Sequence, residues 1–169
     1  ENAQKLKELL KNININTKYL IIQPNRIASK KNRVIVAKQQ VARYDQENTE
    51  EINSDSENAI IENFKNIIES YEVLLLSDYG KGVLTEKLTQ SLISIAKKNN
   101  KKVLVDPKGF NYSKYKGAYL LTPNKKEAGE ATAINIKDNQ TLKKAIIKLK
   151  NDLHLTVSFI TLSEDGVAL

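Results

Sequence analysis

Apolar residues from about residue 56 onward alternate between two spacings, one typical of helices and one typical of buried strands. Short uninterrupted apolar runs predict strands that are covered on both faces. These runs occupy 73–76, 103–105, 118–121 and 156–161. Helical spacing predicts helices over 57–70 and 85–99, Asn124 can cap a short helix through 132, and a longer helix follows over 139–153. Repeated units of this kind predict an α/β fold, a parallel sheet with right-handed crossovers and helices on both faces.

The first part of the chain follows a different pattern. Residues 1–11 have helical spacing, and 19–22 form an apolar run that predicts a strand. Residues 33–37 and 39–44 predict two further strands in which polar side chains recur, so we expect one face to contact water. This pattern favours a small lid-like sheet over a covered core strand.

These patterns divide the chain into regions. We place a lid-like β segment at about 26–45, a polar and acidic linker at 48–57, and an α/β core at about 56–169. The chain begins inside a helical pattern and ends on Val167-Ala168-Leu169, which resembles the start of a strand. We therefore expect residues 1–169 to be a partial domain whose N- and C-terminal parts are missing.

Composition excludes several kinds of chemistry. The chain has no cysteine and one histidine, so a thiolate metal site, a cysteine nucleophile and a histidine-based triad are not expected. No apolar run reaches the roughly 18 residues of a membrane span. The 27 basic and 20 acidic residues give a formal charge of +7, but the lysines are scattered and aromatic residues make up only 6%. Because recognition of single-stranded nucleic acid uses aromatic platforms, we do not expect nucleic acid as a partner. Because no apolar run is long enough to span a membrane, we do not expect a membrane partner either.

Polar residues follow each of the four predicted core strands. In chain order the groups are Ser77, Asp78 and Lys81; Asp106 and Lys108; Thr122 and Asn124; and Thr161, Ser163 and Gly166. Parallel strands bring their carboxyl ends to one edge, so we expect these side chains to line a common crevice. Carboxylates, amides and lysines beside glycines suit phosphate and Mg²⁺. The alternative is that the turns use Gly, Asp and Asn for backbone geometry alone.

Asn124 and Glu127 are the most specific feature of this edge. Their spacing puts both side chains near the first turn of a helix, where backbone amides favour an anion and a carboxylate can hold a hydrated cation. A helix capping box gives the same spacing. Neither G-x-x-x-x-G-K-[ST] nor G-x-G-x-x-G occurs, so a phosphoryl-transfer enzyme on this sheet must belong to another class.

Several motifs together resemble the ribokinase-like carbohydrate kinases. The sequence TPNKKE at 122–127 resembles the Asn-x-x-Glu motif of that family. Within the family, LLLSDYGKGVLT, VLVDPKG followed by YSKYKGAYLLTPN, and KNRVIVAKQQVARYD are most similar to the kinase domain of the D-glycero-D-manno-heptose 7-phosphate kinases, which in many bacteria is fused to a nucleotidyltransferase. The resemblance covers nearly the whole chain and implies a ribokinase-like fold.

The resemblance implies an activity. These kinases use ATP and Mg²⁺ to phosphorylate the anomeric hydroxyl of the heptose 7-phosphate, which gives the 1,7-bisphosphate on the route to ADP-heptose and the lipopolysaccharide core. We therefore expect ATP and a sugar phosphate as small-molecule partners, and a cytoplasmic location. Two alternatives stay open, a kinase for another sugar or nucleoside and a non-catalytic module for binding or dimerisation.

The resemblance also implies roles for residues at the strand ends. Asn124 and Glu127 would organise Mg²⁺ and phosphate through water. Lys108 would neutralise the transferring phosphate, while Asp106 orients its loop. The residues expected to border the nucleotide are Thr161, Ser163 and Gly166, although ribokinases more often have glycine at position 163.

The lid-like segment supplies a further set of charges. We assign Lys31, Arg33 and Arg43 to the sugar 7-phosphate or to closure of the lid, and the alternative is that they are exposed strand charges. Asp78 and Lys81 are candidate edge residues without an assigned role. We also expect a homodimer that forms through the β lid.

Two family motifs do not occur in this sequence. One is Gly-Ala-Gly-Asp, whose aspartate activates the sugar hydroxyl and whose amides form the anion hole. The other is the sugar-binding segment Gly-Gly-Ala-Ala-Asn, expected before Glu1. The expected catalytic base thus lies beyond Leu169, and we expect residues 1–169 on their own to be catalytically inactive.

Overall fold

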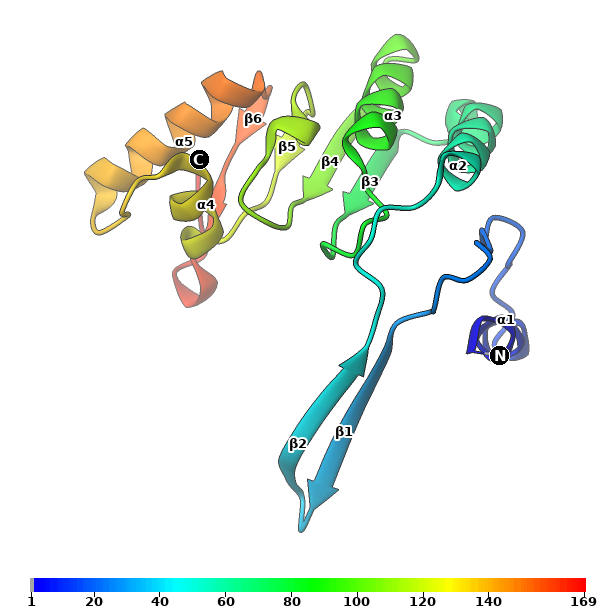
Figure 1. The fold of residues 1–169 in the computed structure, drawn as a ribbon. Coiled ribbons are helices and arrows are strands. Elements are labelled where there is room, and N and C mark those ends of the chain that lie inside the picture. Colours follow the sequence, from blue (N-terminus) through cyan, green and yellow to red (C-terminus); the bar gives the residue numbers. More distant parts are fainter. Residues whose placement is uncertain (1) are drawn as a thin grey trace.

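The computed structural model describes residues 2–169, and its centre is a parallel sheet with strand order β3-β4-β5-β6 (Figure 1). The strands are β3 (Val73–Ser77), β4 (Lys102–Asp106), β5 (Leu120–Leu121) and β6 (Val157–Ser158). The helices around them are α2 (Ser54–Ile67), α3 (Glu86–Lys98), α4 (Lys125–Thr132) and α5 (Asn139–Leu153), with short 3-10 helices at Ile68–Ser70 and Ser113–Tyr115. The predicted parallel α/β sheet is confirmed.

Each helix of this layer begins at a side chain that caps it. The capping residue accepts a hydrogen bond from the backbone N–H three positions further on, and the four caps are Asn53, Thr85, Asn124 and Asp138. Such caps satisfy amides that the first helical turn leaves without a partner. The cap at Asn53 starts α2 inside the segment whose composition predicts a linker. None of the helices in residues 2–169 is long and apolar enough to cross a membrane.

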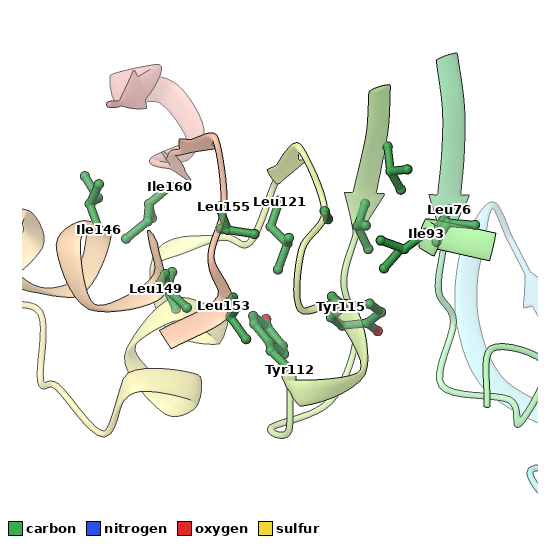
Figure 2. Close-up of a cluster of buried hydrophobic side chains, with 14 of the residues drawn as sticks. Leu76, Ile93, Tyr112, Tyr115, Leu121, Ile146, Leu149, Leu153, Leu155 and Ile160 are labelled. Atoms are coloured by element: carbon green, nitrogen blue, oxygen red, sulfur yellow. The ribbon is translucent and has the colours of Figure 1, made fainter. Parts of the chain in front are cut away.

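The core lies on one face of the sheet. Because side chains alternate along a strand, Leu76, Val105 and Leu121 share a face, where they are buried with apolar side chains of α3 and α5 (Figure 2). The sequence pattern predicts helices on both faces. In the described residues the opposite face stays partly open, and Leu75 there is 65% exposed. The row that crosses all four strands on this face is Leu75, Leu104, Leu120 and Val157.

A two-stranded antiparallel hairpin projects away from the sheet (Figure 1). It comprises β1 (Lys30–Val36) and β2 (Gln39–Gln46), so the two strands predicted in the lid-like segment are confirmed. Ala37 and Lys38 at the turn both have positive φ, which matches the twist of a two-residue hairpin turn. The N-terminal helix α1 (Asn2–Asn12), also predicted, precedes this hairpin.

Two strand predictions are corrected by the structure. Residues 19–22 are not a strand but a turn followed by extended chain, because no strand of the described residues pairs with them. Residues 156–161 are not one continuous strand. The strand is interrupted at Phe159, and β7 (Ile160–Thr161) pairs antiparallel with β8 (Val167–Ala168) while keeping one parallel bridge, from Thr161 to Asn124. The strand-like pattern at the C-terminal end of the chain is confirmed by β8.

The base of the hairpin is held against the loop that follows β3. The guanidinium of Arg26 donates hydrogen bonds to the carbonyl oxygens of Glu50, at 2.8 Å, and of Lys81. The ammonium of Lys81 in turn pairs with Glu47 in the chain that follows β2. Gly82 has a φ of +72°, and a Cβ there would lie 1.9 Å from the carbonyl oxygen of Glu50. A glycine at position 82 therefore permits this close contact.

Candidate active site

The carboxyl ends of the parallel strands lie on one edge of the sheet, as the sequence predicts (Figure 1). Backbone hydrogen bonds join neighbouring strand ends. The N–H of Asp78 donates to the carbonyl oxygen of Asp106 at 2.9 Å, and the N–H of Thr161 donates to that of Pro123 at 2.9 Å. A parallel bridge also pairs Asn124 with Thr161. The structure thus gathers the polar residues of four strand ends into one row.

A lysine and a carboxylate meet in this row. Lys108 follows β4, and its Nζ lies 2.9 Å from Oε1 of Glu127 in the first turn of α4. Oε2 of Glu127 accepts the N–H of Asn124 at 3.1 Å, and Oδ1 of Asn124 accepts the N–H of Glu127 at 2.9 Å. Asn124 and Glu127 therefore form the capping box that the sequence left open as an alternative, and Lys108 binds to it.

At the Lys108 ammonium, an anion from solvent can replace the carboxylate of Glu127. The hydrogen bond from Lys108 to Glu127, followed by the charge of that carboxylate, raises the pKa of the lysine above its ordinary value. Its side chain is nevertheless 55% exposed, so a second anion can approach from solvent. The N-terminus of α4 adds backbone dipoles that favour negative charge at the same place. The site therefore suits a phosphate group.

Mg²⁺, which the family resemblance implies, fits this edge through water molecules. Both oxygens of Glu127 already accept hydrogen bonds, and one of them contacts the Lys108 cation. Residues 2–169 contain no group of three or more His, Cys, Asp or Glu side chains placed to hold a metal directly. Mg²⁺ usually keeps several of its waters in proteins, and the oxygens of Asn124 and Glu127 can accept hydrogen bonds from such waters.

The turn after β7 borders an open cavity. Ser163 begins a short 3-10 helix, Ser163–Asp165, and has a φ of +57°. This left-handed backbone favours glycine, and here it is occupied by serine. Thr161, Ser163 and Asn124 line the cavity of about 790 Å³, which extends to α4 and the start of α5. Ligand sites commonly have volumes of about 300–1,000 Å³, so the cavity has room for a small molecule such as a nucleotide.

Asp78 is buried beneath this edge. Its Oδ2 accepts hydrogen bonds from Nζ of Lys114 and from the hydroxyl of Tyr115, each at 2.6 Å. Its Oδ1 accepts the N–H of Gly80 at 2.7 Å. Burial by itself would raise the pKa of Asp78, but these hydrogen bonds outweigh burial and hold the pKa below its ordinary value. The carboxylate therefore stays charged and joins two segments of chain, the loop after β3 and the segment before β5.

The predicted lid charges lie on one face of the hairpin. Arg33 and Arg43 stand directly opposite each other, and Lys31 is paired with Asp45 in the same register. The guanidinium of Arg43 binds Asp45 with two hydrogen bonds, of 3.0 and 2.7 Å. Like charges directly opposite on a sheet destabilise it, so an anion that binds between the two arginines would relieve their repulsion. The structure thus brings these three side chains together, but on a surface separate from Lys108.

Three residues of this region, Lys114, Tyr115 and Arg26, are not among the candidates that the sequence predicts. Lys114 and Tyr115 lie 36 and 37 positions after Asp78, and Arg26 lies 55 positions before Lys81. Such contacts leave no local spacing that a sequence pattern can reveal. The sole hint is that the segment YSKYKG lies within one of the motifs that carry the family resemblance.

The fold and the polar strand ends define an α/β protein of the sugar kinase type, and the family follows from comparison. Residues 1–169 match the model for the pfkB family of carbohydrate kinases, so the chain belongs to this family. It is similar to two proteins named "Bifunctional protein HldE". The identity is 55% over 169 residues with the Sulfurimonas denitrificans protein and 57% over 167 residues with the Aliarcobacter butzleri protein, covering 100% and 99% of this chain. In both comparisons the chain spans 35% of the relative.

Solved structures support the ribokinase-like fold. The chain resembles phosphofructokinase-2 from Escherichia coli in complex with fructose-6-phosphate, with a TM-score of 0.70 and 22% identity over 97% of this chain and 54% of that chain. It also resembles the protein Sa239, with a TM-score of 0.68 and 17% identity over 98% of this chain and 53% of that chain. The predicted fold class is confirmed.

The buried Asp78 predicts a pH dependence of stability. Because its pKa is lower in the folded protein than the unfolded value of about 3.9, its contribution is complete above that pH and is lost as the pH falls through the folded pKa. Asp78→Asn should lower the free energy of unfolding at pH 7 by about 3 kcal/mol. The difference from wild type should shrink below about pH 4, which urea unfolding across pH measures.

The control for this prediction is Asp152→Asn, which removes an exposed carboxylate paired with Lys148 on α5. This change should alter stability by less than about 1 kcal/mol at any of these pH values. A difference between wild type and Asp78→Asn that stays constant down to pH 2 would contradict the assignment of a charged, hydrogen-bonded Asp78.

Proposed function

We propose that residues 1–169 form the central part of a longer kinase that transfers the γ-phosphate of ATP to the anomeric hydroxyl of D-glycero-D-manno-heptose 7-phosphate. The product would be the 1,7-bisphosphate, made in the cytoplasm on the route to ADP-heptose and the lipopolysaccharide core. Membership of the pfkB family and the heptose kinase motifs support this proposal. The observation that carries it is the ion pair of Lys108 and Glu127 at the N-terminus of α4.

Phosphoryl transfer depends mainly on positioning and on neutralising negative charge. In the proposed reaction the Lys108 ammonium leaves Glu127 and binds the transferring phosphate, while the capping box keeps the first turn of α4 in place. Asn124 and Glu127 would hold the waters of Mg²⁺, which when bound would supply positive charge that neutralises part of the phosphate charge. Thr161 and Ser163, which line the cavity beside α4, would border the nucleotide, together with Gly166 at the end of the same turn.

The hairpin charges suit a sugar that already carries a phosphate group. Arg33 and Arg43 form a concentrated positive surface in which a single carboxylate, Asp45, pairs with Arg43. Guanidinium groups bind phosphate oxygens in a paired geometry, so this surface favours a sugar phosphate over a free sugar or nucleoside. We assign the 7-phosphate of the heptose to this surface, with Lys31 as a third cation.

The hairpin also suits contact with a second copy of the chain. Ile35 and Val36 are 63% and 59% exposed, and Val41 and Tyr44 on β2 are exposed as well. Apolar side chains on a projecting hairpin gain stability when a partner covers them.

We propose that the longer protein is a homodimer joined through this hairpin. Sedimentation of wild type and of Val36→Asp would test whether the hairpin joins two copies. A wild-type protein that sediments as a monomer at micromolar concentration would refute the dimer.

The open face of the sheet favours the proposal that these residues belong to a larger domain. The apolar row that contains Leu75 and Leu104 crosses all four strands outside the core. We propose that the remainder of the kinase domain covers this row and also supplies the catalytic base and the anion hole. Residues 1–169 alone would then lack sugar phosphorylation, whatever nucleotide they bind.

The kinase proposal predicts a large effect at Lys108. In the longer protein, Lys108→Ala should lower kcat for ATP-dependent sugar phosphorylation by about 100-fold or more, because a preorganised charge that contacts the transferring group is lost. Asn124→Ala should also lower kcat. Lys148→Ala, the same change on an exposed face of α5, is the matched control and should keep wild-type turnover. Wild-type turnover in both Lys108→Ala and Asn124→Ala would refute the site.

The substrate proposal predicts a separate effect at Arg33. Arg33→Gln should raise KM for heptose 7-phosphate about tenfold, the size of one charged hydrogen bond, with little change in kcat. Turnover of the unphosphorylated heptose should not respond to this change. Lys38→Gln, at the turn of the same hairpin, serves as the control. An equal rise in KM for both sugars would show that Arg33 does not bind the phosphate group.

A further inference from the structure

Two neighbouring tyrosines in the core differ in what their hydroxyl groups contact. Tyr112 and Tyr115 are both buried, and their rings meet edge to face with centroids 5.7 Å apart (Figure 2). The hydroxyl of Tyr115 donates to Oδ2 of Asp78 at 2.6 Å and accepts the backbone N–H of Lys108 at 3.3 Å. The hydroxyl of Tyr112 is buried without a hydrogen-bond partner among the described residues.

The loop that carries Lys108 is exposed beyond the buried Pro107. Phe110 in this loop is 72% exposed, and a Cβ at Gly109 would meet no described atom within 4 Å. An exposed loop segment samples many conformations unless hydrogen bonds fix its backbone. The hydroxyl of Tyr115 supplies such a hydrogen bond at the backbone of Lys108 itself.

Asp78 supports the same lysine from a second direction. Its Oδ1 accepts the N–H of Gly80, which fixes the backbone of that glycine. The stem of Lys108 lies against it, since a Cβ built on Gly80 would be 3.4 Å from Cγ of Lys108. Lys114 keeps the carboxylate in place through bonds to Asp78 and to the carbonyl oxygen of Leu84. Backbone and side chain of Lys108 therefore both depend on one buried carboxylate.

We propose that Tyr115 is a positioning residue. Its hydroxyl links the buried Asp78 to the backbone of Lys108, and this link holds the lysine ammonium near the proposed phosphate site beside Glu127. Ring packing does not require this hydroxyl, because Tyr112 packs in the same core with its own hydroxyl unpaired. The effect of Tyr115 on turnover rests on the proposed kinase function. The effect on the backbone of Lys108 does not, so the two can be tested apart.

The first test measures the Lys108 backbone directly in the longer protein. Residue-resolved amide hydrogen exchange is compared between wild type, Tyr115→Phe and the matched control Tyr112→Phe. Loss of the acceptor should speed exchange of the Lys108 amide at least tenfold in Tyr115→Phe and leave it unchanged in Tyr112→Phe. The amides of Val103 and Val105 in β4 are the internal reference and should keep wild-type protection in both variants.

Two exchange results would overturn the proposal. One is a Lys108 amide that stays as protected in Tyr115→Phe as in wild type. The other is equal acceleration at Lys108 and at the β4 amides, which would show that the hydroxyl stabilises the fold as a whole and does not position this loop.

The second test measures turnover. Tyr115→Phe should lower kcat for sugar phosphorylation at least tenfold and change KM for the sugar less than twofold, while Tyr112→Phe should match wild type. Equal kcat in the two variants would overturn the proposal. If the wild-type protein phosphorylates no sugar, the kinase proposal fails, and the exchange measurement by itself decides whether Tyr115 positions Lys108.

Discussion

The arrangement of this chain depends on one buried carboxylate. Asp78 lies at the end of β3, where it accepts hydrogen bonds from Lys114, Tyr115 and Gly80. A buried charge costs several kcal/mol unless its hydrogen-bonding capacity is met, so the three donors are fixed around it. They belong to the loop after β3 and to the segment before β5. The carboxylate thereby sets the positions of two neighbouring strand-end loops at the sheet edge.

From Asp78, contacts lead in two directions. Through Tyr115 and Gly80 they reach Lys108, whose ammonium meets Glu127 at the N-terminus of α4. In the other direction, the loop after β3 is bonded to the base of the projecting hairpin through Arg26 and Lys81. The sheet edge proposed to bind the transferring phosphate and the hairpin surface proposed to bind the sugar phosphate are thus attached to the same short loop. This connection gives the hairpin and the sheet edge a fixed common support.

Much of this could be predicted from the sequence because the information is local. Strands β3 and β4 and the helices α3, α4 and α5 follow from apolar spacing, and a parallel sheet then places Lys108 and Asn124 on one edge without further assumptions. The strand predicted at 19–22 was wrong because pairing needs a partner strand, which apolar spacing cannot supply. The bonds of Asp78 to Lys114 and Tyr115 were missed because they join residues 36 and 37 positions apart.

We propose that Lys108 neutralises the transferring phosphate beside the first turn of α4. The most direct test is a crystal structure of the longer protein with Mg²⁺ and a non-hydrolysable ATP analogue. We predict an oxygen of the γ-phosphate within about 3 Å of Nζ of Lys108. We also expect metal-bound water in contact with Asn124 or Glu127. A nucleotide whose phosphates lie away from α4, with Lys108 still bound to Glu127, would contradict this role of Lys108.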